Sequence, residues 1–347
     1  MKAGLHRLLA PVHRQQSGLA LLILLLGIAL TMFAGSHPDP ATDAPVNNFL
    51  NSYTLMQTAT NASFFAIMAV GATMVIAAGK IDLSVGSIYA LSGVAMAMTL
   101  RALAPGTGAS VVVGIVVCLG VGTLCGLLNG VMSVGLGVHP FIITLGTMWA
   151  LRGLAFVISH AESILVPDAL TDVAKATLGL PPGLYPVPLA TMLATTALGF
   201  VVLSRTTMGR HIYAIGGNVE ASRYSGLAIN RLVISVYAIS GLTAGVAAFI
   251  GCAYYGSAAS ADATGYELYV IASAVVGGAS LSGGKGGAVS AALGTLLIVL
   301  IRQSIVTLRL DQNYEWIIIG CAIVTAVAID QFNARLAARR MARERSQ

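Results

Sequence analysis

The sequence predicts an all-α polytopic membrane protein with about ten transmembrane helices. Of its 347 residues, 56% are hydrophobic and only 9% are charged, against about 25% charged residues in an ordinary soluble domain. Its apolar stretches are long and continuous, as in Leu19–Ala34 and Ile317–Ile329, whereas outer-membrane strands alternate over about ten residues. Helices are the other way to satisfy backbone polar groups in lipid. Thirty-nine glycines favour close packing of such helices.

We expect one transmembrane domain over residues 1–347, with a cytoplasmic segment at 1–16, a membrane region at 17–332 and a basic cytoplasmic tail at 333–347. The apolar stretches place the spans near residues 17–35, 55–78, 87–104, 109–134, 140–158, 186–204, 232–254, 267–278, 288–306 and 314–332. A full span needs about 20 residues, so the short eighth stretch predicts a broken or half-spanning helix. The first stretch resembles a signal peptide, but it is at the long end of a signal peptide's apolar region, so we expect an uncleaved helix.

The distribution of Lys and Arg predicts the orientation. With the N-terminus inside, fourteen of these residues lie in inner segments and three, Arg101, Lys175 and Arg309, lie at the outer side. The positive-inside rule therefore predicts two cytoplasmic termini, and it explains the net charge of +6 without a nucleic-acid partner. The outer loops and their edges carry acids instead, namely Asp39, Asp43, Glu162, Asp168, Asp172, Asp262, Glu267, Asp311 and Glu315.

The segment GKIDLSVGS at residues 79–87 is the strongest local motif, with Gly79, Asp82, Leu83, Ser84 and Gly86 as its signature turn. An acid in or near the membrane is costly and indicates function by default. The structural interpretation is that Asp82 and Ser84 cap a helix from about Val85, or that Asp82 pairs with Lys80. We place the turn near the inner edge. The segment also matches residues 277–284 at an offset of 198, either as an internal repeat or as chance similarity.

The inner loop at residues 206–231 is long and basic. Gly216 and Gly217 precede Asn218, which is a good N-cap for a short helix over Val219–Ser225, and Gly226 is suited to end that helix. A short helix in a cytoplasmic loop either docks on a partner or lies on the membrane surface, and the residues alone leave both interpretations open.

Four motifs in order resemble one family. GKIDLSVGSIYALSG is similar to a signature of ribose, xylose, arabinose and galactose ABC-importer permeases, a branch of the binding-protein-dependent permeases that also include branched-chain amino acid permeases. The segments at residues 129–159, 208–230 and 275–287 resemble the family's next signature, inner loop and late glycine-rich segment. The resemblance covers about residues 45–332, and Lys80 stands where the family usually has glycine.

This resemblance implies an ABC importer permease fold with about ten helices, some of them broken. It also implies a second permease subunit (as a homodimer or a heterodimer), an ABC ATPase subunit and a periplasmic sugar-binding protein as partners, in addition to membrane lipid. The inner loop corresponds to the family's ATPase-coupling helix, carried over onto Gly216, Gly217, Asn218, Glu220, Ala221 and Gly226. We therefore expect import of a monosaccharide.

The chain is expected to be no enzyme and to hold no cofactor. Around Lys285 the phosphate-binding pattern fails, because Ala279 replaces the first Gly and Gly286 replaces Ser or Thr. ATP and Mg are thus expected in the partner ATPase. The histidines and the four cysteines show no metal-ligand spacing. Candidates for the translocation path are polar residues within spans, which also act as packing contacts: Asn129, Thr144, Thr147, Arg152, Ser273 and Gln303.

Three alternatives remain open. An ion-coupled secondary transporter needs ion-binding groups near the midplane, and Asp82 is the strongest candidate. An intramembrane enzyme needs converging catalytic groups, and none converge by spacing. A permease for a non-sugar solute, such as a nucleoside, fits the same motifs. In the importer interpretation, we expect the binding protein to dock on the outer acids Asp168, Asp172, Asp262, Asp311 and Glu315.

Overall fold

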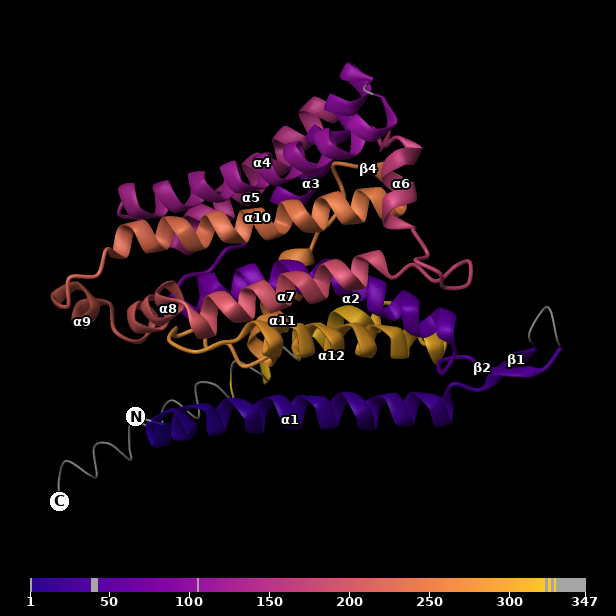
Figure 1. Ribbon diagram of the computed structural model, residues 1–347, viewed down its shortest axis with the longest axis horizontal. Coiled ribbons are helices and arrows are strands. Elements are labelled where there is room, and N and C mark those ends of the chain that lie inside the picture. Colours follow the sequence, from indigo (N-terminus) through magenta and orange to yellow (C-terminus); the bar gives the residue numbers. More distant parts are fainter. Residues whose placement is uncertain (1, 39–42, 105, 322–323, 326–327, 329–347) are drawn as a thin grey trace.

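A computed structural model describes residues 2–38, 43–104, 106–321, 324–325 and 328. The long helices lie side by side, so the molecule has two ends (Figure 1). The elements are α1 (Lys2–Phe33), β1 (Ser36–Pro38), β2 (Pro45–Asn47), α2 (Ser52–Ala77), α3 (Val85–Leu103), α4 (Thr107–Gly135), α5 (Pro140–Ser159), β3 (Ile164–Leu165), α6 (Asp168–Ala174), α7 (Val187–Arg205), α8 (Thr207–Gly217), α9 (Val219–Tyr224), α10 (Ile229–Tyr255), β4 (Ser257–Ala258), α11 (Tyr266–Val276) and α12 (Ala288–Thr307).

Eight helices in the described residues are long and apolar enough to cross a membrane. They agree with eight of the expected spans, and α11 is the short one predicted near residues 267–278. The all-α polytopic fold is therefore confirmed. Residues 314–321 are helical where the tenth span was expected; the rest of that span and the tail at 333–347 lie outside the described residues.

The helix pair at the centre of the fold is α2 and α10. α2 is buried along almost its whole length, whereas α1, α5 and α7 expose most of their surface. The contact between α4 and α10 depends on glycines, because a Cβ on Gly126 would collide with Tyr237 O and one on Gly241 with Gly122 O. Such small residues let membrane helices approach closely.

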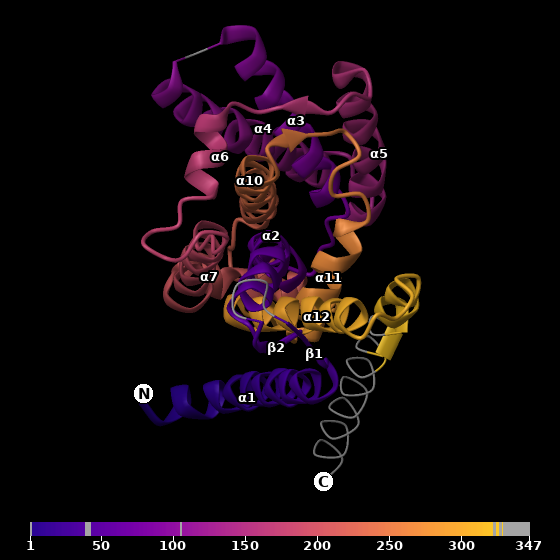
Figure 2. The same cartoon turned by 90° about the vertical axis from the view of Figure 1, so that its right-hand side faces the viewer.

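One end of the molecule carries α8, α9 and the start of α1, and the other carries the β1–β2 hairpin, α6 and β4 (Figure 1). Figure 2 looks along the helices from the second end. There β3 pairs with β4 in antiparallel fashion, with Ile164 opposite Ala258. The distribution of Lys and Arg predicts that the α8–α9 end is the inner one.

Two connections run back into the helix bundle: residues 78–84, between α2 and α3, and the segment that contains α11, between β4 and α12. In the second of these, α11 has 11 residues, so it rises about 16 Å, roughly half of a hydrocarbon layer about 30 Å thick. Its C-terminal end lies toward the α8–α9 end of the molecule, since the segment after it places Gly284 N 2.8 Å from Ala77 O at the end of α2. α11 therefore begins at about half depth, and residues 259–265 descend to it from β4 beside α5 (Figure 2).

The sequence match between residues 79–86 and 277–284 reflects two helices that end in the same way. α2 ends with Lys80 N bonded to Val75 O, and α11 ends with Ala279 N bonded to Ala274 O, in the same six-residue pattern. This equates Gly79 with Gly278, one residue away from the sequence match. The next helix then starts at Val85 in one case and Ala288 in the other, after connections of different length. The two segments are therefore not copies of one structural unit aligned at the offset of 198 residues that the sequence match gave.

Candidate functional site

The signature turn at residues 78–84 carries a buried carboxylate. Asp82 is 2% exposed, and its Oδ1 accepts hydrogen bonds from Ser84 N (2.9 Å) and Ser84 Oγ (2.6 Å). Its Oδ2 accepts one from Ser240 Oγ on α10 (2.8 Å). Three donors satisfy a charge that would otherwise be costly to bury.

Neighbouring polar groups extend this network to two further helices. Asn129 Nδ2 on α4 donates to Ser84 Oγ (2.7 Å), and Thr144 Oγ1 on α5 donates to Ile81 O (3.3 Å). Tyr237 Oη on α10 donates to the same carbonyl (3.0 Å). The turn between α2 and α3 is thus hydrogen-bonded to three further helices, α4, α5 and α10, and the structure brings the sequence candidates Asn129 and Thr144 together.

The expectations for Asp82 need two corrections. Ser84 occupies the N-cap position of α3, but its side chain makes no capping bond there, and the described ion pairs do not include Lys80 with Asp82. The turn is also deeper than its place after α2 indicated. Ser240 is near the middle of α10 (Ile229–Tyr255), about 17 Å from its start, because residues 78–84 climb back into the bundle.

The inner loop contains two helices where the sequence predicted one. Gly216 and Gly217 form the last turn of α8, a helix that the sequence analysis missed. α9 follows directly, with Asn218 as its N-cap: the Asn218 side chain accepts from Ala221 N at 2.9 Å. Gly226 has a φ of +76° and ends the helix as predicted, with Leu227 N bonded to Ser222 O. Glu220 is in the first turn, and Ala221 is exposed.

A glycine junction joins this loop to the end of α2 and to the segment between α11 and α12. We use that name for Gly79, Gly216, Gly283 and Gly284, whose backbones touch one another. A Cβ on Gly216 would collide with Ala77 O, and one on Gly283 would lie 2.9 Å from the Cα atoms of Gly216 and Gly79. Three segments distant in the sequence therefore meet through backbone atoms alone.

Tyr213 fastens α8 to the same glycine-rich segment. Its Oη donates to Gly286 O at 2.7 Å. Burial raises the pKa of Tyr213 to about 12, so the phenol keeps its proton at neutral pH and remains a donor. An aromatic residue in a basic loop gave no sequence signal for this contact.

The remaining path candidates lie apart from the turn. Arg152 on α5 donates from Nη1 to Ser260 O (2.7 Å) and Asp262 O (2.5 Å). Thr147 bonds within its own helix and Gln303 bonds to Thr307. Ser273 is fully buried, and its hydroxyl has no partner. The six candidates therefore do not line one common surface.

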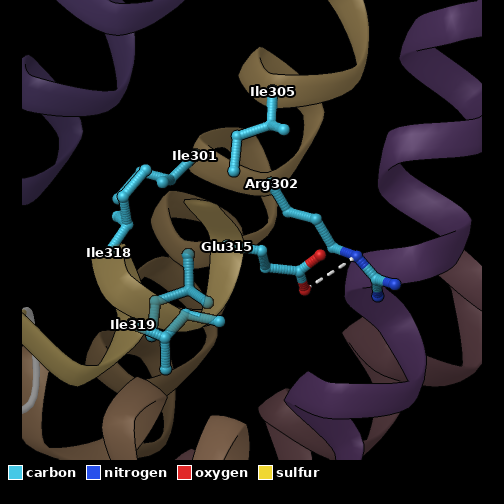
Figure 3. Close-up of a pocket in the computed structure, with 7 residues that line it drawn as sticks. Ile301, Arg302, Ile305, Glu315, Ile318 and Ile319 are labelled. Atoms are coloured by element: carbon cyan, nitrogen blue, oxygen red, sulfur yellow. Dashed lines mark ion pairs between the residues drawn. The ribbon is translucent and has the colours of Figure 1, made fainter. Parts of the chain in front are cut away.

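Arg302, another charged residue within a span, pairs with Glu315 at 3.1 Å beside a space of about 10 Å³ lined mainly by isoleucines (Figure 3). Tyr269 Oη also donates to Glu315. That space is at the lower limit for a single water, so we interpret the pair as packing between α12 and the helix that starts at residue 314.

Two of the acids expected on the outer side have internal partners. Glu315 is in that ion pair, and Asp262 Oδ2 accepts from Ala259 N at 2.8 Å. Glu267, expected at an outer edge, lies in the first turn of α11 against Gly86 at about half depth. Asp168, Asp172 and Asp311 are exposed. Ser240 and Glu267 were missed as site residues; a polar residue inside an apolar stretch was the available signal for each.

Groups of at least three His, Cys, Asp or Glu side chains placed to hold a metal ion are not found among the described residues.

Comparison with known proteins identifies the family. Residues 54–328 match the family described as branched-chain amino acid transport system, permease component. The chain is 33% identical to the D-allose transport system permease protein of Escherichia coli K12 over 309 residues, covering 88% of this chain and 90% of that protein. It is 35% identical to the ribose import permease protein of the same strain over 320 residues (91% and 93% covered).

A third relative, the fructose import permease protein of Rhizobium meliloti, is 29% identical over 344 residues, which cover 97% of this chain and 91% of that protein. The match spans most of the membrane region, including the signature turn, the inner loop and the glycine junction. The chain therefore belongs to the family of branched-chain amino acid transport system permease components, and it is a multi-pass membrane protein similar to sugar import permeases.

Proposed function

We propose that the chain is the permease subunit of a binding-protein-dependent ABC importer that moves a monosaccharide into the cytoplasm. The observation that carries this proposal is the placement of α9. It is a short helix, closed by Asn218 and Gly226, at the end of the molecule that the distribution of Lys and Arg predicts to be the inner one. Relatives that import allose, ribose and fructose support a sugar as the cargo.

In this proposal, α9 docks in a groove of the ATPase subunit, which holds ATP and Mg. A movement of α9 reaches α8 through Asn218, whose backbone N–H is bonded to Ala214 O at 3.0 Å. It then passes through Gly216 to the end of α2 and to the segment between α11 and α12. A contact made of backbone atoms transmits displacement well, because it has no side chain that can change rotamer.

The assembly includes a second permease subunit and a periplasmic sugar-binding protein, in the bacterial inner membrane with both termini cytoplasmic. Ion-coupled transport fits less well. Asp82, the strongest candidate for an ion site, has both carboxylate oxygens bonded to serine hydroxyls or backbone.

The test uses two positions of α9 and a conservative control at each. Ala221→Arg places a long side chain on the exposed docking surface, with Ala221→Ser as control. Gly226→Val forces a β-branched residue to a φ of +76°, which costs about 1 kcal/mol or more, and Gly226→Asn is its control because Asn tolerates this conformation.

We expect all four variants to insert in the membrane, since no span is altered. Ala221→Arg and Gly226→Val should lose co-purification with the ATPase subunit or ATP-driven sugar uptake in proteoliposomes, and the controls should keep both. Normal ATPase binding and uptake by Ala221→Arg and Gly226→Val would show that α9 is not the coupling element.

A further inference from the structure

Three charged side chains lie near one another at about half depth, where residues 259–265 reach α11. Arg152 comes from α5, Asp262 from residues 259–265 and Glu267 from the first turn of α11. Arg152 is 9% exposed, and Asp262 and Glu267 are half-buried. Ionisable groups at this depth are costly and indicate function by default.

The opposite charges attract one another but do not make contact. Arg152 interacts electrostatically with both Glu267 and Asp262, yet no N···O distance between it and either carboxylate is within 4.0 Å. Arg152 uses one nitrogen, Nη1, for two backbone carbonyls, although a guanidinium carries five N–H donors. Backbone N–H groups at Gly265 and Glu267 stabilise the Glu267 carboxylate, but its buried Oε2 has no hydrogen-bond partner among the described residues. An unsatisfied buried oxygen of this kind is uncommon in a folded protein.

A glycine on α3 leaves the space that the Glu267 side chain and the descending segment occupy. A side chain on Gly86 would collide with Glu267 Oε2 and Ala263 O, so the glycine lets the descending segment lie directly on α3. Arg152 then holds that segment by the carbonyls of Ser260 and Asp262. In secondary transporters, a broken helix with polar groups near the midplane is the usual place for substrate.

Trp316 lies against this segment. Trp149 is on α5, one turn before Arg152, and is 69% exposed; Trp316 is 60% exposed. A Cβ on Gly265 would lie 3.6 Å from the Trp316 ring. Exposed indole rings offer a broad, rigid apolar surface with one N–H donor.

We infer that Arg152, Asp262 and Glu267, with Trp316 beside them, form the subsite where the permease itself contacts the hydroxyl groups of the sugar in transit. The inference rests on the proposed function and adds the residues that touch the cargo. The charges of these three residues favour a neutral ligand, because Arg152 repels a cation and the two carboxylates repel an anion. A neutral polyol suits both signs, because its hydroxyls donate to the carboxylates and accept from the guanidinium.

The test measures ATP-driven uptake by the complete complex of permease, ATPase and binding protein in proteoliposomes. Uptake of the transported sugar is compared with uptake of its monodeoxy analogues. Glu267→Gln keeps the size of the side chain and removes the charge. The control is Glu162→Gln, the same change on an exposed loop outside the subsite.

Because every variant uses the same binding protein, a changed ratio between sugar and analogue reports the permease alone. We expect wild type to prefer the sugar over at least one deoxy analogue, and Glu267→Gln to reduce that preference by about tenfold, equivalent to about 1.4 kcal/mol. Glu162→Gln should leave the ratio unchanged. A site built to bond a hydroxyl discriminates against an analogue that lacks it, whereas a purely structural carboxylate does not.

An equal loss of uptake for every sugar, or an unchanged ratio, would overturn the inference while wild-type uptake upholds the proposed function. Failure of wild type itself to import any sugar with ATP would overturn the proposed function instead. If Glu267→Gln does not co-purify with the ATPase, Asp262→Asn provides the same measurement, because Asn still accepts from Ala259 N through its side-chain oxygen.

Discussion

At the scale of single residues, Asp82 shows how this protein holds an acidic side chain inside the membrane region. Among the described residues it has no ion-pair partner, and it accepts hydrogen bonds from hydroxyl and backbone donors of two elements. A hydrogen bond to a charged group contributes about 1.5–3 kcal/mol. The network therefore fixes the position of the turn at residues 78–84 and also supplies hydrogen bonds to the Asp82 side chain.

The contribution of Ser240 can be measured against another serine of the same helix. Ser240→Ala leaves Asp82 Oδ2 without its donor, so we expect a loss of about 1–3 kcal/mol. Ser235→Ala removes only a bond from Oγ to Arg231 O within α10 and should change stability little. Thermal unfolding of the purified protein in detergent tests the difference. Equal melting temperatures for the two variants would contradict the role given to Ser240.

At the scale of elements, the glycine junction explains the position of several glycines that the sequence could not distinguish. Gly216 and Gly217 are adjacent and both helical, yet only Gly216 lies against Ala77 O; nothing is within 4 Å of a Cβ on Gly217. From the sequence, the pair was expected to precede the short helix that starts at Asn218. The structure makes it the end of α8, because contact with α2 and with Gly283 requires a surface without side chains.

The two glycines therefore provide a matched pair of variants. Gly216→Ala forces Ala77 or Gly284 to move, and overpacking of this kind costs about 1–3 kcal/mol. Gly217→Ala should be neutral or slightly stabilising, since Ala favours a helix over Gly by about 0.5–1 kcal/mol. We expect Gly216→Ala to lower the melting temperature and to reduce ATP-driven uptake, whereas Gly217→Ala keeps both near wild type. Identical behaviour of the two variants would show that the junction does not transmit movement.

At the scale of the whole molecule, the sequence predicted the fold class and most spans because a bilayer imposes length and apolarity on every crossing helix. It also predicted α9 from Asn218 and Gly226, since caps depend on local residues. Depth was harder to predict. Asp82 and Glu267 were assigned to the inner and outer sides because they follow or precede apolar stretches. Both lie deeper, since broken helices return into the bundle through contacts with α10 and α3 that no local pattern encodes.

Orientation is the property of the whole molecule that depends most directly on charge, and cysteine labelling tests it. Among the described cysteines, Cys321 is exposed and the other three are buried, so Cys321→Ser removes the reactive background. In that variant, Tyr224→Cys reports on α9, where Tyr224 is 91% exposed. Glu162→Cys reports on the exposed connection between α5 and β3.

The inner segments carry fourteen Lys and Arg residues against three at the outer side, and positive segments stay in the cytoplasm. A membrane-impermeant maleimide added to intact spheroplasts should therefore label Glu162→Cys but not Tyr224→Cys. After lysis it should label both, which shows that Tyr224→Cys is reactive. Labelling of Tyr224→Cys in intact spheroplasts would place α9 outside, away from any cytoplasmic ATPase, and would contradict the orientation together with the coupling role proposed for α9.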